Sequence, residues 1–299
     1  MKDIIPYVIL NPNMKRPFRV ALPPVDFWST KIRRREHFQF LKINHGFFGH
    51  VAEISTDSNF PQTPEDLASK MYDGRGHYHT KVDKSTYTHA VCSLWHTIRT
   101  KKPNIHLGVS DSNGFAWLQH GDTKHGKSPD HSALVNLTTG TTINYIHGGI
   151  FRHYAVTDEM EILFKELNTE DVNLIVVGPA YCKDYISKLV NFTHVPIPTT
   201  NALNELDFIL KLIESKFDKN KHNVIIGSCA LVAYPLCERL IKNNKLNSTF
   251  IDVGRALDYY IRKQLKQPWL KGHTVHKWAP VVRKIRNSKN QKTVNRNSI

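Results

Sequence analysis

Short apolar runs alternate with helix-like periodicity through the carboxy-terminal part of the chain. The runs cover residues 174–177, 193–197, 224–226 and 250–253, and several of them end at glycine or proline. Strands that are apolar on both faces and alternate with helices are typical of a buried parallel sheet. In such a sheet the strand tips feed the amino termini of helices. The pattern therefore predicts a crevice suited to a phosphorylated ligand.

The segments between these runs have helical spacing. We expect helices over residues 184–190, 203–217 and 230–243, the second because its apolar residues recur every three or four positions. Pro235 lies inside the third, which predicts a kink there.

The amino-terminal half is less regular. Strands are expected over residues 38–43 and 105–109, and helices over 63–72 and 86–100. Residues 1–36 are basic and contain several prolines that discourage helix, so an irregular segment is expected there.

The predicted fold class is therefore α/β: a Rossmann-like single domain with a mostly parallel sheet and helices on both faces. We expect this domain to span residues 37–270. A basic and disordered tail is expected over residues 271–299, which contain eight Lys or Arg and no Asp or Glu.

The net charge of +15 points to a polyanionic partner. The tail would hold an acidic membrane surface or RNA, or else simply be solvated. No apolar run approaches the roughly 18 residues that span a bilayer, and the amino terminus has the wrong flanks for a secretory signal. We therefore expect a cytoplasmic protein, peripheral to a membrane through its tail and without a transmembrane segment.

The cysteines are few and scattered, and none forms a CxxC pair. They are Cys92, Cys182, Cys229 and Cys237. This distribution predicts free thiols rather than a disulfide framework or a structural zinc site.

Three features carry candidate chemistry. Gly227 and Ser228 lie where a strand enters a helix, so their backbone N–H groups are placed to bind a phosphate oxygen or else form a tight structural turn. Asp252 ends the last strand, where a carboxylate acts as a base, binds a ribose or metal, or caps a helix. Arg152 follows two glycines, and its planar fork suits a diphosphate unless it is a surface residue.

The chain has neither GxGxxG nor a Walker motif, which argues against a dinucleotide oxidoreductase and a P-loop ATPase.

Taken in order, these pieces resemble the GT-D-type glycosyltransferases, nucleotide-sugar enzymes of bacterial glycan and glycoprotein assembly. The resemblance covers about residues 140 to 265 and rests on short motifs: Gly178-Pro179, His194 through Pro198 with Asn201-Ala202, Gly227-Ser228-Cys229-Ala230, Ile251-Asp252-Val253-Gly254, and the preceding Arg152. It implies donor binding by Arg152, Gly178, Asn201, Gly227, Ser228 and Gly254.

The family also has an amino-terminal signature, a strand running into Arg-x-Gly-Asp-Gly-Glu, whose acidic residues are associated with metal and nucleotide-sugar binding. Here the matching stretch runs from Lys42 to Phe47, with histidine at the Asp position and phenylalanine at the Glu position. The resemblance implies that Asn44 and Gly46 bind the donor. Given this departure, either His45 would contact the diphosphate or Asp111, at a neighbouring strand tip, would supply the missing charge. The family resemblance implies a divalent metal, manganese or magnesium. Because the acidic residues of the signature are replaced here, the sequence assigns no ligands to that metal.

The expected function is transfer of a sugar from a nucleoside diphosphate sugar donor to the hydroxyl of a glycan or glycoconjugate acceptor. The candidate catalytic residues are Asp252, Asp111 and His45. Two alternatives stay open: a nucleic-acid-binding protein, favoured by the charge, and a catalytically inactive GT-D-like binding module, favoured by the altered acidic motif.

Overall fold

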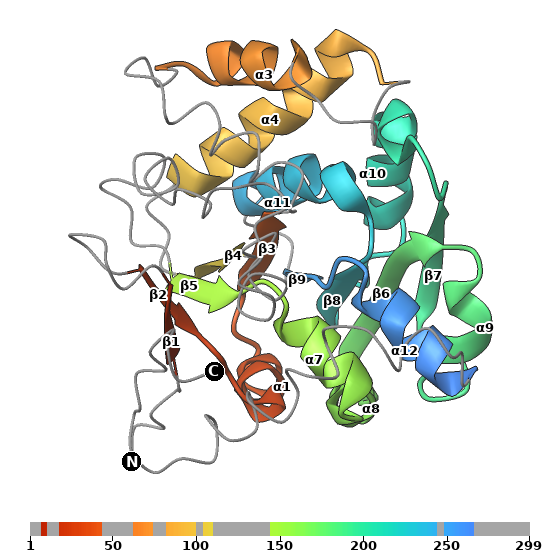
Figure 1. Cartoon of the computed structure of the whole chain (residues 1–299). Coiled ribbons are helices and arrows are strands. Elements are labelled where there is room, and N and C mark those ends of the chain that lie inside the picture. The colour runs from red at the N-terminus through yellow and green to blue at the C-terminus, as the bar shows by residue number, and fades with distance from the viewer. Residues whose placement is uncertain are drawn as a thin grey trace.

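The computed structural model describes residues 7–10, 18–43, 62–73, 82–99, 104–109, 144–243 and 248–265. Within these residues a single nine-stranded sheet runs in the order β1-β2-β5-β4-β3-β9-β8-β6-β7 (Figure 1). The strands are β1 (Tyr7–Leu10), β2 (Phe18–Ala21), β3 (Gln39–Ile43), β4 (Ile105–Val109), β5 (Asn144–His147), β6 (Val172–Pro179), β7 (Thr193–Ile197), β8 (His222–Gly227) and β9 (Ser248–Asp252). Only β1 pairs antiparallel, against β2; the other pairs are parallel. The predicted α/β, Rossmann-like fold is confirmed.

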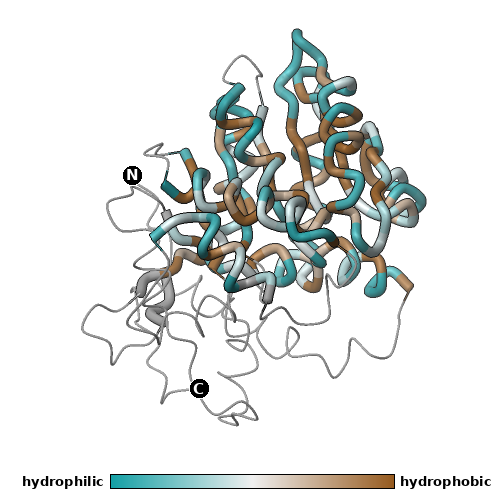
Figure 2. Tube along the Cα trace, turned by 90° about the horizontal axis from the view of Figure 1, so that it is seen from above, coloured by the Kyte–Doolittle hydropathy of each residue, from teal (hydrophilic) through white to brown (hydrophobic). Residues whose placement is uncertain are grey.

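Helices cover both faces of this sheet (Figure 1). One layer contains α3 (Pro64–Asp73), α4 (Lys84–Arg99), α10 (Leu206–Glu214) and α11 (Ala233–Lys242). The other contains α1 (Val25–Arg33), α7 (Ile150–Val156), α8 (Glu159–Leu167), α9 (Cys182–Ile186) and α12 (Ala256–Gln264). Apolar segments fill the interior, and hydrophilic ones gather on the outer turns of the helices (Figure 2).

The two cores follow from the side-chain alternation of the strands. In β3, Phe40 packs into the core under α1 and α7, whereas Leu41 and Ile43 pack into the core under α4 and α11. Adjacent residues of β6 divide in the same way, since Ile175 and Val176 are both fully buried in opposite cores. Burial on both faces explains the continuous apolar runs of the sequence.

The amino-terminal prediction was wrong. Residues 1–36 were expected to be irregular, yet β2 and α1 lie within them, so the α/β domain begins before residue 37. Pro24 precedes α1 as its N-cap residue instead of interrupting the helix. Trp28 is completely buried and donates a hydrogen bond from Nε1 to the Tyr154 hydroxyl of α7 at 3.2 Å. Tertiary packing of this kind outweighs the local proline signal. The predicted tail, residues 271–299, lies outside the described residues.

The helices also begin and end differently from the prediction. Residues 230–243 form a 3₁₀ turn, Ala230–Val232, followed by α11, so Pro235 lies in the first turn of α11 and kinks no long helix. A proline is tolerated there because the first turn leaves its N–H groups without intrahelical partners. Residues 203–217 divide likewise into a 3₁₀ turn, Ala202–Glu205, and α10. The helix predicted over residues 184–190 is the shorter α9, which begins earlier.

The connections of the two central strands lead to opposite layers. After β3 the next described helices, α3 and α4, lie in one layer, whereas α12 follows β9 in the other. Neighbouring strands whose connections diverge in this way form a topological switch point, where open α/β sheets place their ligands beyond the carboxyl ends of the strands.

Two further observations limit the chemistry of the chain. Cys92, Cys182, Cys229 and Cys237 are all free thiols. Of the helices that the structure describes, none combines the length and apolarity that crossing a bilayer requires.

Candidate anion-binding site

Lys42 and Asp252 lie side by side at the carboxyl ends of β3 and β9. The carboxylate of Asp252 accepts the backbone N–H of Lys42 at 3.3 Å through Oδ2 and that of Gly254 at 2.9 Å through Oδ1. Gly254 has a φ of +54°, which favours glycine and turns its N–H back toward the carboxylate. One oxygen of Asp252 is thus bonded to β3 and the other to the turn after β9.

The side chain of Lys42 is buried at this edge of the sheet. It lies on the same face of β3 as Phe40, the face covered by α7 and α12. It packs on Gly254, where an added Cβ would approach Nζ to 3.2 Å. Burial lowers the pKa of Lys42, and Arg152 lowers it further while Asp252 opposes the shift. Burial likewise raises the pKa of Asp252, against the attraction of Lys42.

Arg152 reaches the same place from α7. Its guanidinium lies 5.5 Å from the centre of the Tyr259 ring of α12, and its Nε is buried without a hydrogen-bond partner. In the part of the chain that the structure describes, no ion pair joins Arg152 to a carboxylate. Burial lowers the pKa of this guanidinium. A cation held out of water without a paired anion is unfavourable, so the arrangement indicates a place for an anionic ligand.

A second arginine and a tyrosine form the outer boundary of the cluster. Arg255 donates from Nε to Asp258 at 3.2 Å, and the hydroxyl of Tyr181 donates to the same carboxylate. The side chain of Arg255 is 63% exposed, so this cation faces solvent and is already paired. Asp258 pairs with Arg255 and also attracts Arg152, so the two arginines and this carboxylate together carry one positive charge.

His147, at the end of β5, is neutral at physiological pH. Its Nδ1 accepts the backbone N–H of Gly149 at 3.1 Å. Burial lowers the pKa of His147 to about 3, and the charges of Lys42, Arg152 and His153 add to the shift. Burial and the neighbouring cations thus disfavour the protonated form of His147.

The predicted phosphate turn lies beside this cluster. Gly227 pairs with Asp252 in the β8–β9 ladder. A Cβ on Gly178 would lie 3.5 Å from the Cβ of Ser228 and 4.0 Å from Leu257 of α12. The ends of β6, β8 and β9 thus meet against α12.

The structure brings together most of the predicted residues that it describes, namely Arg152, Gly178, Gly227, Ser228, Asp252 and Gly254. Asn201 is the exception in position. It precedes the 3₁₀ turn Ala202–Glu205, which packs on α4 and on the turn Ala230–Val232, in the layer opposite to α7 and α12. The remaining candidates, Asn44, His45, Gly46 and Asp111, lie outside the described residues.

The cluster also contains residues that sequence reasoning missed. Lys42 was named only as part of the altered motif, and His147 and Tyr259 were not singled out. Lys42 carried a usable signal, because a lysine inside a strand that is buried on both faces is rarely accommodated without a partner. The other two depend on how α7 and α12 pack.

The described residues do not assemble a metal site. Among them no group of three or more His, Cys, Asp or Glu side chains is placed to hold a metal ion. The one carboxylate of the cluster core, Asp252, has both oxygens bonded to backbone amides. The divalent metal therefore stays a prediction.

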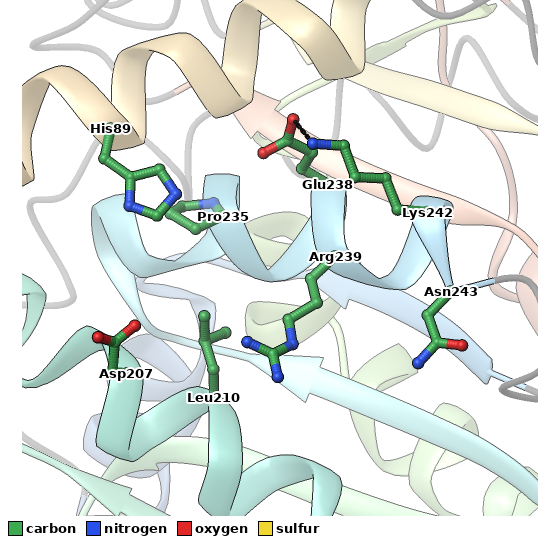
Figure 3. A pocket seen from close by; sticks show the side chains of 8 residues that line it. All are labelled: His89, Asp207, Leu210, Pro235, Glu238, Arg239, Lys242 and Asn243. Carbon is green, nitrogen blue, oxygen red and sulfur yellow. Dashed lines mark ion pairs between the residues drawn. The ribbon is translucent and has the colours of Figure 1, made fainter.

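A groove of about 430 Å³ lies elsewhere, between α4, α10 and α11 (Figure 3). It is lined by His89, Asp207, Leu210, Pro235, Glu238, Arg239, Lys242 and Asn243. Its cations are paired: Lys242 with Glu238 at 2.7 Å, and Arg239 with Glu214 through two hydrogen bonds. Both cations of the groove therefore already have a carboxylate partner.

No protein-family model matches this sequence, no curated protein matches it, and no solved structure matches its fold. The functional argument therefore depends on the cluster itself.

Proposed function

We propose that the protein is a glycosyltransferase that moves a sugar from a nucleoside diphosphate sugar to an acceptor hydroxyl in glycan or glycoconjugate synthesis. The observation that carries the proposal is the partly buried guanidinium of Arg152, which makes no ion pair among the described residues, beside the buried Lys42 at the switch point of a parallel sheet. Diphosphates are ligands that such a place accommodates.

The chemistry of sugar transfer requires the charge of the departing diphosphate to be stabilised. Arg152 presents a planar fork to two phosphate oxygens, and Lys42 adds a compact charge from the floor of the site. The backbone N–H of Ser228 is bonded to the carbonyl of Val177 at 2.8 Å, so this turn joins the ends of β6 and β8 beside the anion instead of contacting it. In this mechanism Asp252 orients the β9 turn, because its oxygens are engaged, and His45 and Asp111 remain the candidates for proton transfer at the acceptor.

The wider setting belongs to the same proposal. A cytoplasmic enzyme whose basic residues 271–299 attach it to an acidic membrane surface would meet lipid-linked or membrane-bound acceptors. Vesicle sedimentation with and without anionic lipid tests this attachment, and equal binding to neutral vesicles would count against it.

The donor site is tested by isothermal titration calorimetry of the full chain with UDP, GDP, CDP and ADP, with and without manganese. We expect one nucleoside diphosphate to bind with a dissociation constant below millimolar and the matching nucleoside not to bind. Absence of binding by all four removes the proposal. Binding without donor hydrolysis or transfer would indicate the inactive binding module instead.

A further inference from the structure

The side chains of Asp252 and Lys42 lie on opposite faces of the sheet at its carboxyl edge. The carboxylate is fixed by two backbone amides. Burial raises the pKa of the thiols Cys229 and Cys237 in the layer of α11, and the charge of Asp252 adds to the shift. The Lys42 side chain lies on the opposite face, with Phe40, toward α7 and α12. Lys42 is thus the group of this pair that faces Arg152.

The charges that face Lys42 come from every neighbouring element. Arg152 of α7 and Arg255, just before α12, repel its ammonium, Asp252 of β9 attracts it, and His147 of β5 is neutral. Arg255 is offset by Asp258. The remaining balance is two cations, Lys42 and Arg152, against the single carboxylate of Asp252.

We propose that Lys42 binds a phosphate group of the ligand directly and that its Nζ takes up a proton from solvent when the ligand binds. The inference rests on the proposed donor site and deepens it, because it assigns the anion-sensing residue and its coupling to pH. The ligand chemistry is a phosphate or diphosphate, and no covalent bond forms or breaks.

The physical basis is that a bound anion changes the electrostatic environment of Lys42 from one that disfavours its positive charge to one that favours it. Without an anion, a protonated Lys42 lies out of water beside a second cation, and its pKa is lowered to about 7. An arriving dianion stabilises the ammonium and restores its affinity for a proton. Ligand affinity must then depend on pH above neutrality, since binding and protonation are linked.

The test is calorimetry of the full chain with UDP at pH 8, in buffers of different ionisation enthalpy. UDP is fully ionised there, because a terminal phosphate titrates near pH 6. We expect uptake of about 0.9 proton per site and a dissociation constant that rises about tenfold from pH 8 to pH 9.

Two variants at Lys42 and one control complete the design. Lys42→Met should bind UDP more weakly, with no proton uptake and no pH dependence in this range. Lys42→Arg should bind without uptake, because guanidinium stays charged. Lys242→Met, in the groove of α11, should behave as the wild type. Thermal unfolding of each variant establishes that it is folded.

The outcomes separate the two proposals. UDP binding without proton uptake overturns the role of Lys42 and leaves the transferase proposal intact. If UDP does not bind, sodium sulfate, which does not titrate in this range, is the second probe. Sulfate binding with proton uptake that Lys42→Met abolishes supports the inference alone, and failure to bind either anion overturns it.

Discussion

The carboxyl edge at β3 and β9 and the groove between α4, α10 and α11 both contain charged side chains. The cations of the groove are exposed and paired, whereas those of the edge are buried and make no ion pair among the described residues. In the groove Lys242 and Arg239 each pair with a glutamate, and the Lys242 side chain is 69% exposed. At the edge Lys42 is 4% exposed, and Arg152 carries a buried Nε without a partner. Exposed pairs are nearly neutral energetically, whereas a buried unbalanced cation is maintained against a cost. The proposed function therefore places the ligand where charge is uncompensated and not in the groove.

Replacing Arg152 by methionine gives the largest expected change. The variant loses a charge-assisted contact to phosphate, so the dissociation constant for UDP should rise about 10- to 100-fold. Calorimetry measures it, with Arg239→Met as the matched control from the groove. A loss of affinity in the control but not in Arg152→Met would reverse the comparison.

His147 should make the folded state sensitive to acid. Its pKa is 6.5 in an ordinary environment and about 3 in the fold, so the unfolded chain takes up the proton first. The contribution to stability is fully present above pH 6.5 and is lost progressively toward pH 3. At pH 5 the free energy of unfolding should be about 2 kcal/mol lower than at neutral pH because of His147.

The His147→Asn variant isolates this contribution, because Asn keeps an acceptor for the N–H of Gly149 and does not titrate. Urea unfolding at pH 7.5 and pH 5 should show a smaller drop in the free energy of unfolding than in the wild type. An unchanged drop would mean that protonation of His147 does not contribute to the loss of stability in acid.

Substitution of Gly254 by alanine should weaken both the fold and the site. The left-handed backbone costs an L residue roughly 1–2 kcal/mol. The new Cβ would also approach Nζ of Lys42 to 3.2 Å and displace it. Chemical denaturation should show the loss, and UDP affinity should fall with it. Normal UDP affinity in a destabilised variant would separate Lys42 from the ligand.

The smallest effect is expected in the groove. Arg239→Met breaks a partly exposed pair with Glu214, so the free energy of unfolding should fall by at most about 1 kcal/mol. Its dissociation constant for UDP should stay within twofold of the wild type. A larger loss of stability would show that the groove is less balanced than its ion pairs indicate.

The sequence predicted the parts of the fold that local pattern encodes. The bounds predicted for β4 and β7 are those observed, because apolar runs stop there at polar or proline-containing loops. The grouping of Gly227 and Asp252 was also predictable, since both end parallel strands. The strand at residues 18–21 and the helix after it were not, because their stability comes from contacts such as that between Trp28 and Tyr154.

The composition of the site was harder to predict than its location. Lys42 and Arg152 meet only because β5, β4, β3 and β9 are neighbours in the sheet, and strand order is not written in any local segment. For the same reason the sequence did not show that Asn201 adjoins the layer of α4 and α11 and not that of α7 and α12. Short motifs identify strand ends but not which ends adjoin.

A cluster drawn from the beginning, middle and end of the domain has a consequence for how the molecule is handled. Lys42, Arg152 and Gly254 belong to β3, α7 and the turn after β9, so any fragment that holds all three must span more than 200 residues. A bound nucleotide would fasten these distant segments to one another. At a ligand concentration 100 times the dissociation constant, it should raise the free energy of global unfolding by about 2.7 kcal/mol. Melting temperature then becomes a sensor of occupancy, and a nucleotide library can be screened on the intact chain before any acceptor is known.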